Sequence, residues 1–341
     1  MKDMIIIDGL TVKKGDKGFA FLEVKDKFGY VTELPTGIIN GIEVGPVLLV
    51  TAGLHGCEYD GIEAATRLYK ELSTDALHGG LVIITCMNLP SLRMRTPFVV
   101  PLDNRNLNYS FPGRQNGSAA EVIAYTIQTN FLPVADYMID CHGGDIGEAF
   151  LPITMAVQTD DEKVSLRSKE LAGWFGLDYS YYDDARAGAH ASDPPGPRFD
   201  GSWLFEANKA GIPAIASEAG CDGQCKEQDV LIHMKGVRNV MRHLRMISDA
   251  IEKIGLNVRT SYFRSMFVVK AFSPGIFYPR VKLGSRIANG DILAELRDLK
   301  GDLIEEVKAP DNGVVFQVNT RRFVNSGERL YLAFGLQSED K

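Results

Sequence analysis

Short apolar runs that alternate with helical patterns constrain the fold of this 341-residue chain most strongly. Val47–Thr51 has the length and composition of a strand that is covered on both faces of a sheet. Similar apolar runs occupy residues 81–85, 137–140 and 213–217. Helical patterns lie between the runs, at residues 61–72 and 119–131. This alternation predicts an α/β fold in which a sheet lies between two layers of helices.

The two ends of the chain lack this alternation of strands and helices. Phe19 to Pro35 carries β-forming residues interrupted by turn residues, which indicates short antiparallel strands in an N-terminal β segment, residues 1–45. From about Ile251 the chain consists of short β segments separated by Gly and Asn, without a helical period. We therefore expect a catalytic domain at residues 1–255 and a small all-β domain at 256–341.

Composition excludes several classes of protein. A net charge of -7 provides no basic surface for nucleic acid, and no apolar run approaches the length of a membrane span. The N-terminus lacks the apolar core of a signal peptide, so we expect a cytoplasmic protein. The cysteines are odd in number and sparse, which favours free buried thiols over disulfides: Cys57, Cys86, Cys141, Cys221 and Cys225.

Polar residues follow three of the apolar runs directly. His55, His142 and Glu218 each come at or just after the carboxyl end of a predicted strand. In open sheets of this kind, ligands bind beyond the carboxyl ends of the strands. We therefore expect these three side chains to meet at one edge of the sheet, although they are far apart in the sequence.

The run His55-Gly-Cys-Glu58 offers two metal ligands three residues apart, one in a loop and one at the start of a helix. An imidazole nitrogen and a carboxylate oxygen suit zinc. The simpler interpretation is a loop histidine beside an acid that favours the helix dipole.

The run Asp140-Cys-His142-Gly-Gly offers a third ligand, followed by glycines that allow a substrate to approach the backbone. The alternative is a histidine that is hydrogen-bonded within a loop. Asp140 is a candidate to orient the imidazole of His142, because zinc-bound histidines usually donate their second N–H to a carboxylate. It is equally compatible with a strand-end acid that faces away.

Glu218 closes an apolar strand, where a carboxylate can take a proton from a metal-bound water. By itself it is only an acid at a strand end. Two histidines and one glutamate leave a fourth metal position open, which is typical of a catalytic rather than a structural zinc site.

Four runs in order resemble the succinylglutamate desuccinylase/aspartoacylase family, a branch of the zinc carboxypeptidase superfamily. They are Gly53-Leu-His-Gly-Cys-Glu58, Asp103-Asn-Arg-Asn-Leu-Asn-Tyr-Ser-Phe-Pro-Gly113, Asp140-Cys-His142 and Ile212-Pro-Ala-Ile-Ala-Ser-Glu218. The resemblance covers roughly residues 30 to 335. It implies a zinc-carboxypeptidase-like α/β/α sandwich with a mostly parallel mixed sheet, and a zinc enzyme that hydrolyses a small N-acyl amino acid or a related amide.

The resemblance also assigns roles. It implies that one zinc ion (Zn2+) per chain is held by His55, Glu58 and His142, and that Glu218 is the general acid/base. Family members carry an arginine that stabilises the oxyanion, for which Arg95 is our candidate.

One family position differs in this chain. The family run Asn-Leu-Asn-Arg binds the substrate carboxylate, but here Tyr109 follows Asn108. A tyrosine cannot make the bidentate, charge-assisted contact that an arginine makes with a carboxylate. Either Arg105 compensates or the substrate carries a different group at this point.

The remaining histidines differ in promise. His190 lies in the Tyr-, Asp-, Gly- and Pro-rich stretch from Tyr179 to Phe199, which we interpret as a loop over the site, so His190 is a candidate substrate contact. His78 precedes two glycines in a predicted loop. His233 and His243 fall in the helical pattern Val230 to Ile251, for which a solvated helix face is the better interpretation.

The C-terminal region resembles the barrel-sandwich fold of biotinyl and lipoyl domains. Lys300 lacks the flanking pattern of a carrier lysine and is interpreted as a hairpin residue. We expect this region to wall the active site or to support contacts between copies in a homo-oligomer.

Two rival functions remain at this point. A metallocarboxypeptidase acting on peptides needs a carboxylate clamp, which Tyr109 weakens. A non-catalytic binding protein would keep the metal but not the chemistry, and the presence of Glu218 with all three ligands argues against it. A site of two histidines and one glutamate also accepts other divalent metals.

Overall fold

The computed structural model describes residues 3–26, 29–184, 201–256 and 260–336. Its main sheet follows the spatial order β14-β21-β19-β10-β12-β9-β5-β6-β4-β3. The strands have the following bounds: β3 Lys17–Asp26, β4 Gly29–Asn40, β5 Glu43–Ala52, β6 His78–Ile84, β9 Tyr137–His142, β10 Glu148–Gln158, β12 Ala214–Cys221, β14 Met266–Lys270, β19 Gly313–Asn319 and β21 Arg329–Gly335.

The centre of the sheet is parallel. Strand β5 lies between β6 and β9, strand β9 pairs with β12, and all of these pairs are parallel. Antiparallel strands flank them, with β3 and β4 on one side and β10, β19 and β21 on the other. The carboxyl ends of β5, β9 and β12 therefore meet at one edge.

Helices cover both faces, which confirms the predicted α/β/α sandwich. One apolar core contains side chains of α1, α4 and α6, and a second core on the other face contains those of α3 and α5. The bounds of the helices are α1 Tyr59–Glu71, α2 Leu89–Met94, α3 Ala119–Phe131, α4 Glu162–Phe175, α5 Trp203–Lys209 and α6 Glu227–His243. Helix α6 thus ends earlier than the predicted pattern to Ile251.

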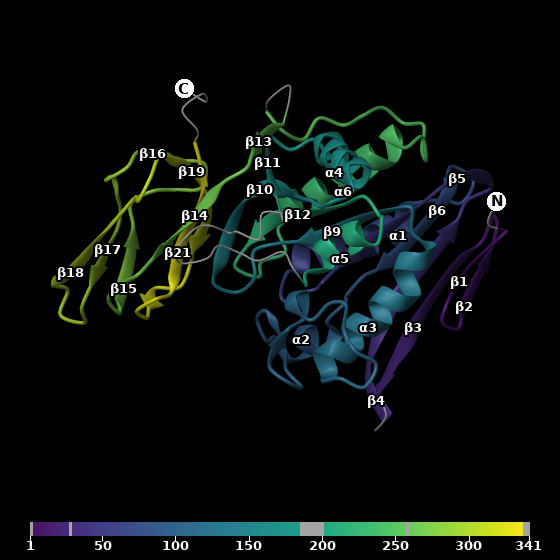
Figure 1. Cartoon of the computed structure of the whole chain (residues 1–341), viewed down its shortest axis with the longest axis horizontal. Coiled ribbons are helices and arrows are strands. Elements are labelled where there is room, and N and C mark those ends of the chain that lie inside the picture. The colour runs from purple at the N-terminus through teal and green to yellow at the C-terminus, as the bar shows by residue number, and fades with distance from the viewer. Residues whose placement is uncertain (1–2, 27–28, 185–200, 257–259, 337–341) are drawn as a thin grey trace.

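The C-terminal strands lie at one end of the molecule and β1 and β2 at the other (Figure 1). A third apolar core fills the space between β14, β19 and β21 and a second antiparallel sheet. That sheet consists of β15 Gly275–Pro279, β17 Ile292–Arg297, β18 Leu303–Lys308 and β20 Phe323–Val324. The short strands outside it are β1 Met4–Ile7, β2 Leu10–Lys13, β7 Val99–Val100, β8 Arg105–Asn106, β13 Ser261–Phe263 and β16 Arg286–Ile287.

Strand β19 pairs with β10, so the C-terminal region continues the main sheet while keeping an apolar core of its own. The division at residues 255 and 256 stays a prediction. Lys300 lies between β17 and β18, as expected for a hairpin residue.

The stretch from Tyr179 begins as a strand rather than a loop. Residues Tyr179–Asp184 form β11, which pairs in parallel with β10 and with β13, and its tyrosines suit a strand because aromatic residues favour a packed sheet surface. The rest of that stretch, including His190, lies outside the described residues.

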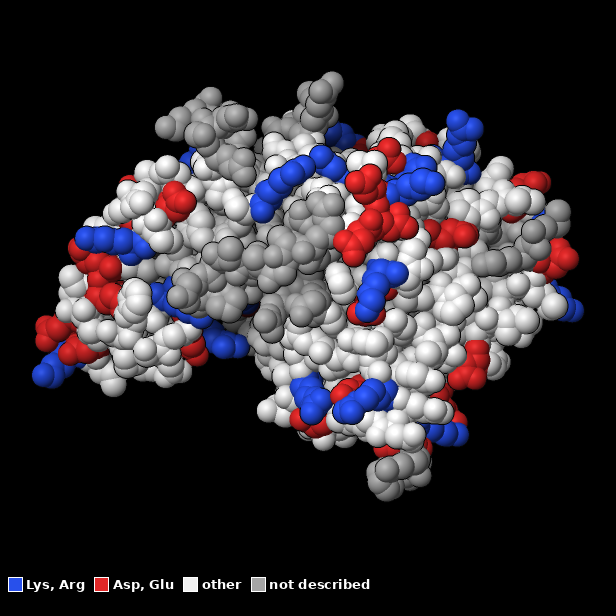
Figure 2. All heavy atoms as spheres, in the orientation of Figure 1, with Lys and Arg blue, Asp and Glu red and all other residues white. Residues whose placement is uncertain are grey.

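Cys57, Cys86 and Cys141 are buried free thiols, as predicted, whereas Cys225 is exposed. Basic and acidic side chains are interspersed on the face that Figure 2 shows. Among the described residues, no helix combines the length and apolar composition needed to cross a membrane.

Close packing at Gly61 sets the distance between α1 and β9. A Cβ atom added at Gly61 would lie 2.5 Å from the carbonyl oxygen of Cys141, which belongs to the backbone and cannot rotate away. Glycine at this point therefore allows the start of α1, with Glu58, to approach the end of β9.

We predict that Gly61→Ala lowers the free energy of unfolding by about 1–2 kcal/mol. Alanine improves helix propensity by about 1 kcal/mol, but overpacking against a backbone atom that cannot rotate away is expected in the upper part of its usual range, about 2–3 kcal/mol. Urea denaturation measures the change, with Lys70→Ala on the exposed side of α1 as the control. A variant as stable as the wild type would show that the two elements do not need this contact.

Candidate metal centre and active site

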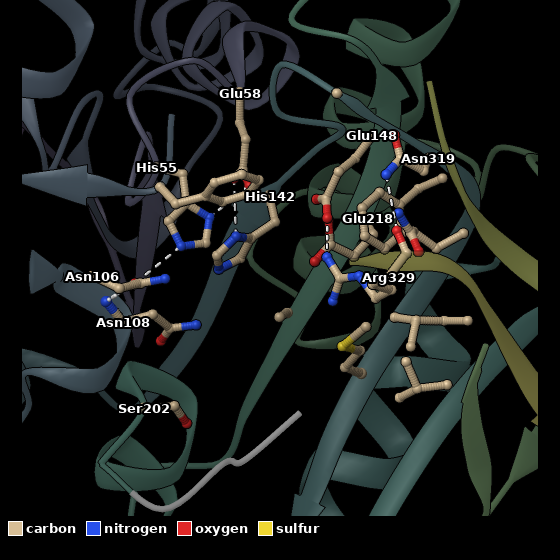
Figure 3. A pocket seen from close by; sticks show the side chains of 18 of the residues that line it. His55, Glu58, Asn106, Asn108, His142, Glu148, Ser202, Glu218, Asn319 and Arg329 are labelled. Atoms are coloured by element: carbon tan, nitrogen blue, oxygen red, sulfur yellow. Dashed lines mark hydrogen bonds and ion pairs between the residues drawn. The ribbon is translucent and has the colours of Figure 1, made fainter. Parts of the chain in front are cut away.

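Three side chains from two loops and a strand converge on one point. His55 follows β5, Glu58 stands at the N-cap of α1, and His142 is the last residue of β9. Their nearest nitrogen and oxygen atoms all lie within 4.8 Å of one another, and all three side chains are buried. Figure 3 shows the two imidazoles and the carboxylate directed toward each other.

The Glu58 carboxylate uses one oxygen for each histidine. Its Oε1 lies 2.7 Å from Nδ1 of His55, and its Oε2 lies 2.9 Å from Nδ1 of His142. This explains why Glu58 makes no side-chain cap hydrogen bond to α1 although it occupies the N-cap position. The helix start fixes the position of the carboxylate, and the carboxylate is directed at the histidines.

Charge compensation holds this buried cluster together. Burial acts to raise the pKa of Glu58, but the imidazoles of His55 and His142 outweigh it and hold that pKa at about 2. Burial likewise acts to lower the pKa of His142, and the carboxylates of Glu58 and Asp140 raise it well above its usual value. A divalent cation would supply the same compensation, so the donor set fits a metal.

A chain of hydrogen bonds behind His142 orients its ring. His142 Nε2 lies 2.9 Å from Oδ2 of Asp140, and the Thr51 hydroxyl donates to Oδ1 of Asp140 at 2.7 Å. The Trp203 indole N–H in turn donates to Thr51 Oγ1 at 3.1 Å. Asp140 therefore contacts His142 instead of facing away, and leaves Nδ1 of that ring for the metal point.

His55 is oriented from the opposite side. Its Nε2 lies 3.3 Å from Oδ1 of Asn106, and the same oxygen accepts the backbone N–H of Asn108 at 2.8 Å. Both histidines thus present Nδ1 to Glu58 while their other nitrogens have fixed partners. Asn106 is a site residue that the motif analysis missed, since only its neighbours were singled out.

Glu218 lies beside the cluster. It is the register partner of His142 in the parallel pair β12 and β9, and it is 8% exposed. Its Oε2 has no hydrogen-bond partner among the described residues. Burial raises the pKa of Glu218 well above its usual value, against an opposing effect of His142.

One cavity of about 590 Å³ connects these groups. Its wall includes the three candidate ligands, Asp140 and Glu218, together with polar side chains from several other elements. A cavity of this size fits a small molecule, since ligand sites of that kind measure roughly 300–1,000 Å³.

Comparison with known proteins decides the family. Residues 44–244 match the model of the succinylglutamate desuccinylase/aspartoacylase catalytic domain, which is more than half of the chain. The chain belongs to the succinylglutamate desuccinylase/aspartoacylase family.

Individual relatives agree with this family. The chain is 27% identical over 308 residues to N-alpha-acetyl-L-2,4-diaminobutyric acid deacetylase of Halomonas elongata, covering 87% of this chain and 84% of that protein. The product-bound ectoine utilization protein EutE (DoeB) of Ruegeria pomeroyi is 26% identical, with a TM-score of 0.81 and coverage of 94% and 95%. A family protein of Rhodobacter sphaeroides shares the fold at 21% identity, with a TM-score of 0.80 and coverage of 94% and 96%. The comparisons support the predicted class of enzyme, a deacylase of small N-acyl amino acids.

Of the other residues predicted to contact the substrate, some line the cavity and some do not. Asn108 and Tyr109 line the cavity. Arg95 is exposed at the C-cap of α2, and Arg105 is exposed and lies 3.4 Å from Glu121, so neither reaches the cavity wall. Their roles stay predictions without support from this geometry.

The C-terminal region forms one wall of the cavity, as expected, but none of the residues that form it was predicted individually. These residues carry no motif, and only the pairing of β10 with β19 brings them to the cavity. They are Lys270, Gln317, Asn319, Arg321, Glu328 and Arg329, and Glu148 of β10, which pairs with Arg329, lines the same cavity.

The prediction that His233 faces solvent was wrong. His233 is fully buried, its Nδ1 lies 3.0 Å from the Ser217 hydroxyl, and its Nε2 lies 3.4 Å from the carbonyl oxygen of Ala219. It thereby joins α6 to the two residues on either side of Glu218. His243, by contrast, is exposed, as predicted, and its ring stacks on Trp174; His78 is exposed at the start of β6.

Burial lowers the pKa of His233 from 6.5 to about 4. Between pH 6.5 and pH 4, the imidazole of His233 therefore binds a proton in the unfolded chain but not in the folded chain. The stabilisation that neutral His233 provides is fully present above pH 6.5 and is lost as the pH falls toward 4.

We predict that the advantage of the wild type over His233→Asn in free energy of unfolding decreases by about 2 kcal/mol from pH 7 to pH 5. Both proteins are measured without metal, so that the other histidines titrate in the same way in the wild type and in the variant. Urea denaturation at the two pH values measures it. A difference that does not change with pH would mean that His233 is not held neutral.

Proposed function

We propose that this chain is a zinc-dependent deacylase that hydrolyses the amide bond of a small N-acyl amino acid. The observation that carries the proposal is the convergence of His55, Glu58 and His142 beside Glu218 on one cavity of small-molecule size. Two imidazole nitrogens and one carboxylate oxygen are the donor set of catalytic zinc sites that leave a position for water.

A zinc ion held by His55, Glu58 and His142 would act as a Lewis acid on the acyl carbonyl and lower the pKa of a water molecule. Glu218 would accept a proton from that water at its Oε2, which has no hydrogen-bond partner among the described residues. The oxygen of that water would bond to the acyl carbon, and the same carboxyl group would donate its proton to the leaving nitrogen as the C–N bond breaks. An amine and a carboxylic acid are released, and they exchange a proton to become an ammonium and a carboxylate. Burial of Glu218 favours its protonated form between these two steps.

The described side chains fix the geometry of this reaction. Asp140 and Asn106 hold the two imidazoles, and the paired strands β9 and β12 hold His142 and Glu218 next to each other. These contacts limit movement of the ligands, which is what a site must do to place the reacting atoms.

The identity of the relatives suggests the substrate class. The Halomonas elongata relative deacetylates N-alpha-acetyl-L-2,4-diaminobutyric acid, a small N-acyl amino acid. A cavity of about 590 Å³ suits a molecule of that size better than an extended peptide.

We predict that Glu218→Gln keeps zinc but loses about 10²–10⁴-fold in kcat, the contribution expected from one general acid/base. The amide has the shape of the carboxyl group but cannot accept the proton. Hydrolysis of a panel of N-acetyl and N-succinyl amino acids measures turnover, and elemental analysis measures zinc.

Asp140→Asn provides a second prediction. Its matched control is Asp136→Asn, since Asp136 directly precedes β9 at the end of that strand opposite to His142. Loss of the carboxylate behind His142 weakens zinc binding by about 10–100-fold, whereas the control, whose carboxylate accepts the Val47 backbone N–H, keeps wild-type affinity. Competition with a chelator measures both. Full turnover of Glu218→Gln, or equal zinc affinity of the two aspartate variants, would contradict the proposed site.

A further inference from the structure

Two basic side chains lie opposite each other on the C-terminal wall of the cavity. Lys270 of β14 and Arg329 of β21 are cross-strand partners, and both line the cavity. Like charges directly opposite each other on neighbouring strands destabilise a sheet. A pair of this kind is expected where an anion lies between or beside the two charges.

Glu148 supplies part of that negative charge. Its carboxylate pairs with Arg329 Nη2 and is only 9% exposed as a residue, while the Arg329 side chain is 34% exposed. In the part of the chain that the structure describes, Arg329 has no other side-chain partner and the Lys270 ammonium has none. Among the described residues, this wall therefore pairs one of its two opposed cations with a carboxylate and leaves the other without a side-chain partner.

The other charged groups on this wall are already engaged or exposed. Arg321 is exposed and donates from Nη2 to the carbonyl oxygen of Ile146 at 3.1 Å. Glu328 is half-buried, and its carboxylate accepts the Asn325 backbone N–H at 2.9 Å and the Asn325 side-chain N–H at 3.3 Å. The wall as a whole carries three basic and two acidic side chains, which leaves it suited to an anion.

A buried amide lies on the same wall. Gln317 is 1% exposed, and its Oε1 has no partner among the described residues. Buried polar atoms are nearly always hydrogen-bonded, so an unpartnered one beside a cavity indicates a ligand or water there. This observation is independent of the charges and also places a polar ligand against the C-terminal wall.

The wall lies across the pocket from His55, Asn106 and Asn108, as Figure 3 shows for Glu148, Asn319 and Arg329. A small amide whose carbonyl is at the metal point would therefore have its other end directed toward the wall. Tyr109 and Arg329 line the same cavity. The charge that is missing at position 109 is thus available from a different strand.

We propose that Arg329 and Lys270 bind the carboxylate of the amino-acid part of the substrate, with Glu148 holding the guanidinium in place. This inference rests on the proposed deacylase function. A guanidinium presents parallel donors that match a carboxylate, and the lysine adds a second positive charge. Both residues lie outside the part of the chain that matches the family catalytic domain, residues 44–244, so the C-terminal region chooses the substrate.

The test compares an acid with its amide. The probe is the best-hydrolysed member of a panel of N-acetyl and N-succinyl amino acids, together with the same compound in which the carboxylate is replaced by a primary carboxamide. The ratio of kcat/KM for the acid to that for the carboxamide measures carboxylate recognition. The wild type is expected to prefer the acid.

We predict that Arg329→Gln lowers this ratio by about 10–100-fold, the size expected when charge-assisted hydrogen bonds are lost. Lys270→Gln lowers it less, and the double variant removes the preference. The loss is expected in KM for the acid, while the zinc content stays near the wild-type value. Arg329→Lys keeps the positive charge but loses the two parallel N–H donors of the guanidinium. Its ratio is expected to lie between those of the wild type and Arg329→Gln.

Arg280→Gln is the matched control. Arg280 also belongs to the C-terminal region and pairs with a glutamate, Glu295, but it does not line the cavity. Its ratio is expected to equal that of the wild type, since it removes an arginine–glutamate pair without touching the proposed site.

A double variant that still prefers the acid by the wild-type factor would overturn the inference, as would a wild type without that preference. Failure of the proposed function looks different, because zinc-loaded wild type would then hydrolyse no member of the panel. In that case calorimetry with the corresponding free amino acids decides the inference. Weaker binding to the double variant supports the carboxylate site, and equal binding overturns it.

Discussion

A single buried carboxylate, that of Glu58, organises this active site. It bridges the Nδ1 atoms of His55 and His142 at 2.7 and 2.9 Å, and the two imidazoles lower its pKa, which favours the charged carboxylate inside the protein. A buried charge without compensation is costly, so the two imidazoles stabilise this carboxylate inside the protein. Close packing of α1 on β9 at Gly61 makes the bridge sterically feasible.

The surrounding structure keeps this cluster from rearranging. Asp140, Thr51 and Trp203 connect the His142 ring to α5, and His233 connects the strand of Glu218 to α6. Helices on both faces of the sheet are therefore joined to the site by buried hydrogen bonds. Such contacts position reacting groups without touching a substrate, which is how a rigid scaffold supports catalysis.

Much of this arrangement follows from the sequence pattern. Apolar runs that end in His142 and Glu218 predict strands whose carboxyl ends meet, and the parallel register of β9 and β12 places these two residues side by side. His233 could not be placed in this way, because its helix has polar neighbours and its partners are on a distant strand. Lys270 and Arg329 had no signal either, since their position depends on the pairing of β19 with β10 and of β14 with β21.

Reconstitution of metal-stripped protein tests the central claim most directly. Zinc is added in steps to the chelated, folded chain, and hydrolysis of the N-acyl amino acid panel is followed together with bound metal. We predict that activity rises in proportion to zinc and stops rising at one ion per chain, and that Glu58→Gln takes up far less metal at the same free zinc concentration. Full activity without metal, or undiminished zinc uptake by Glu58→Gln, would contradict the account.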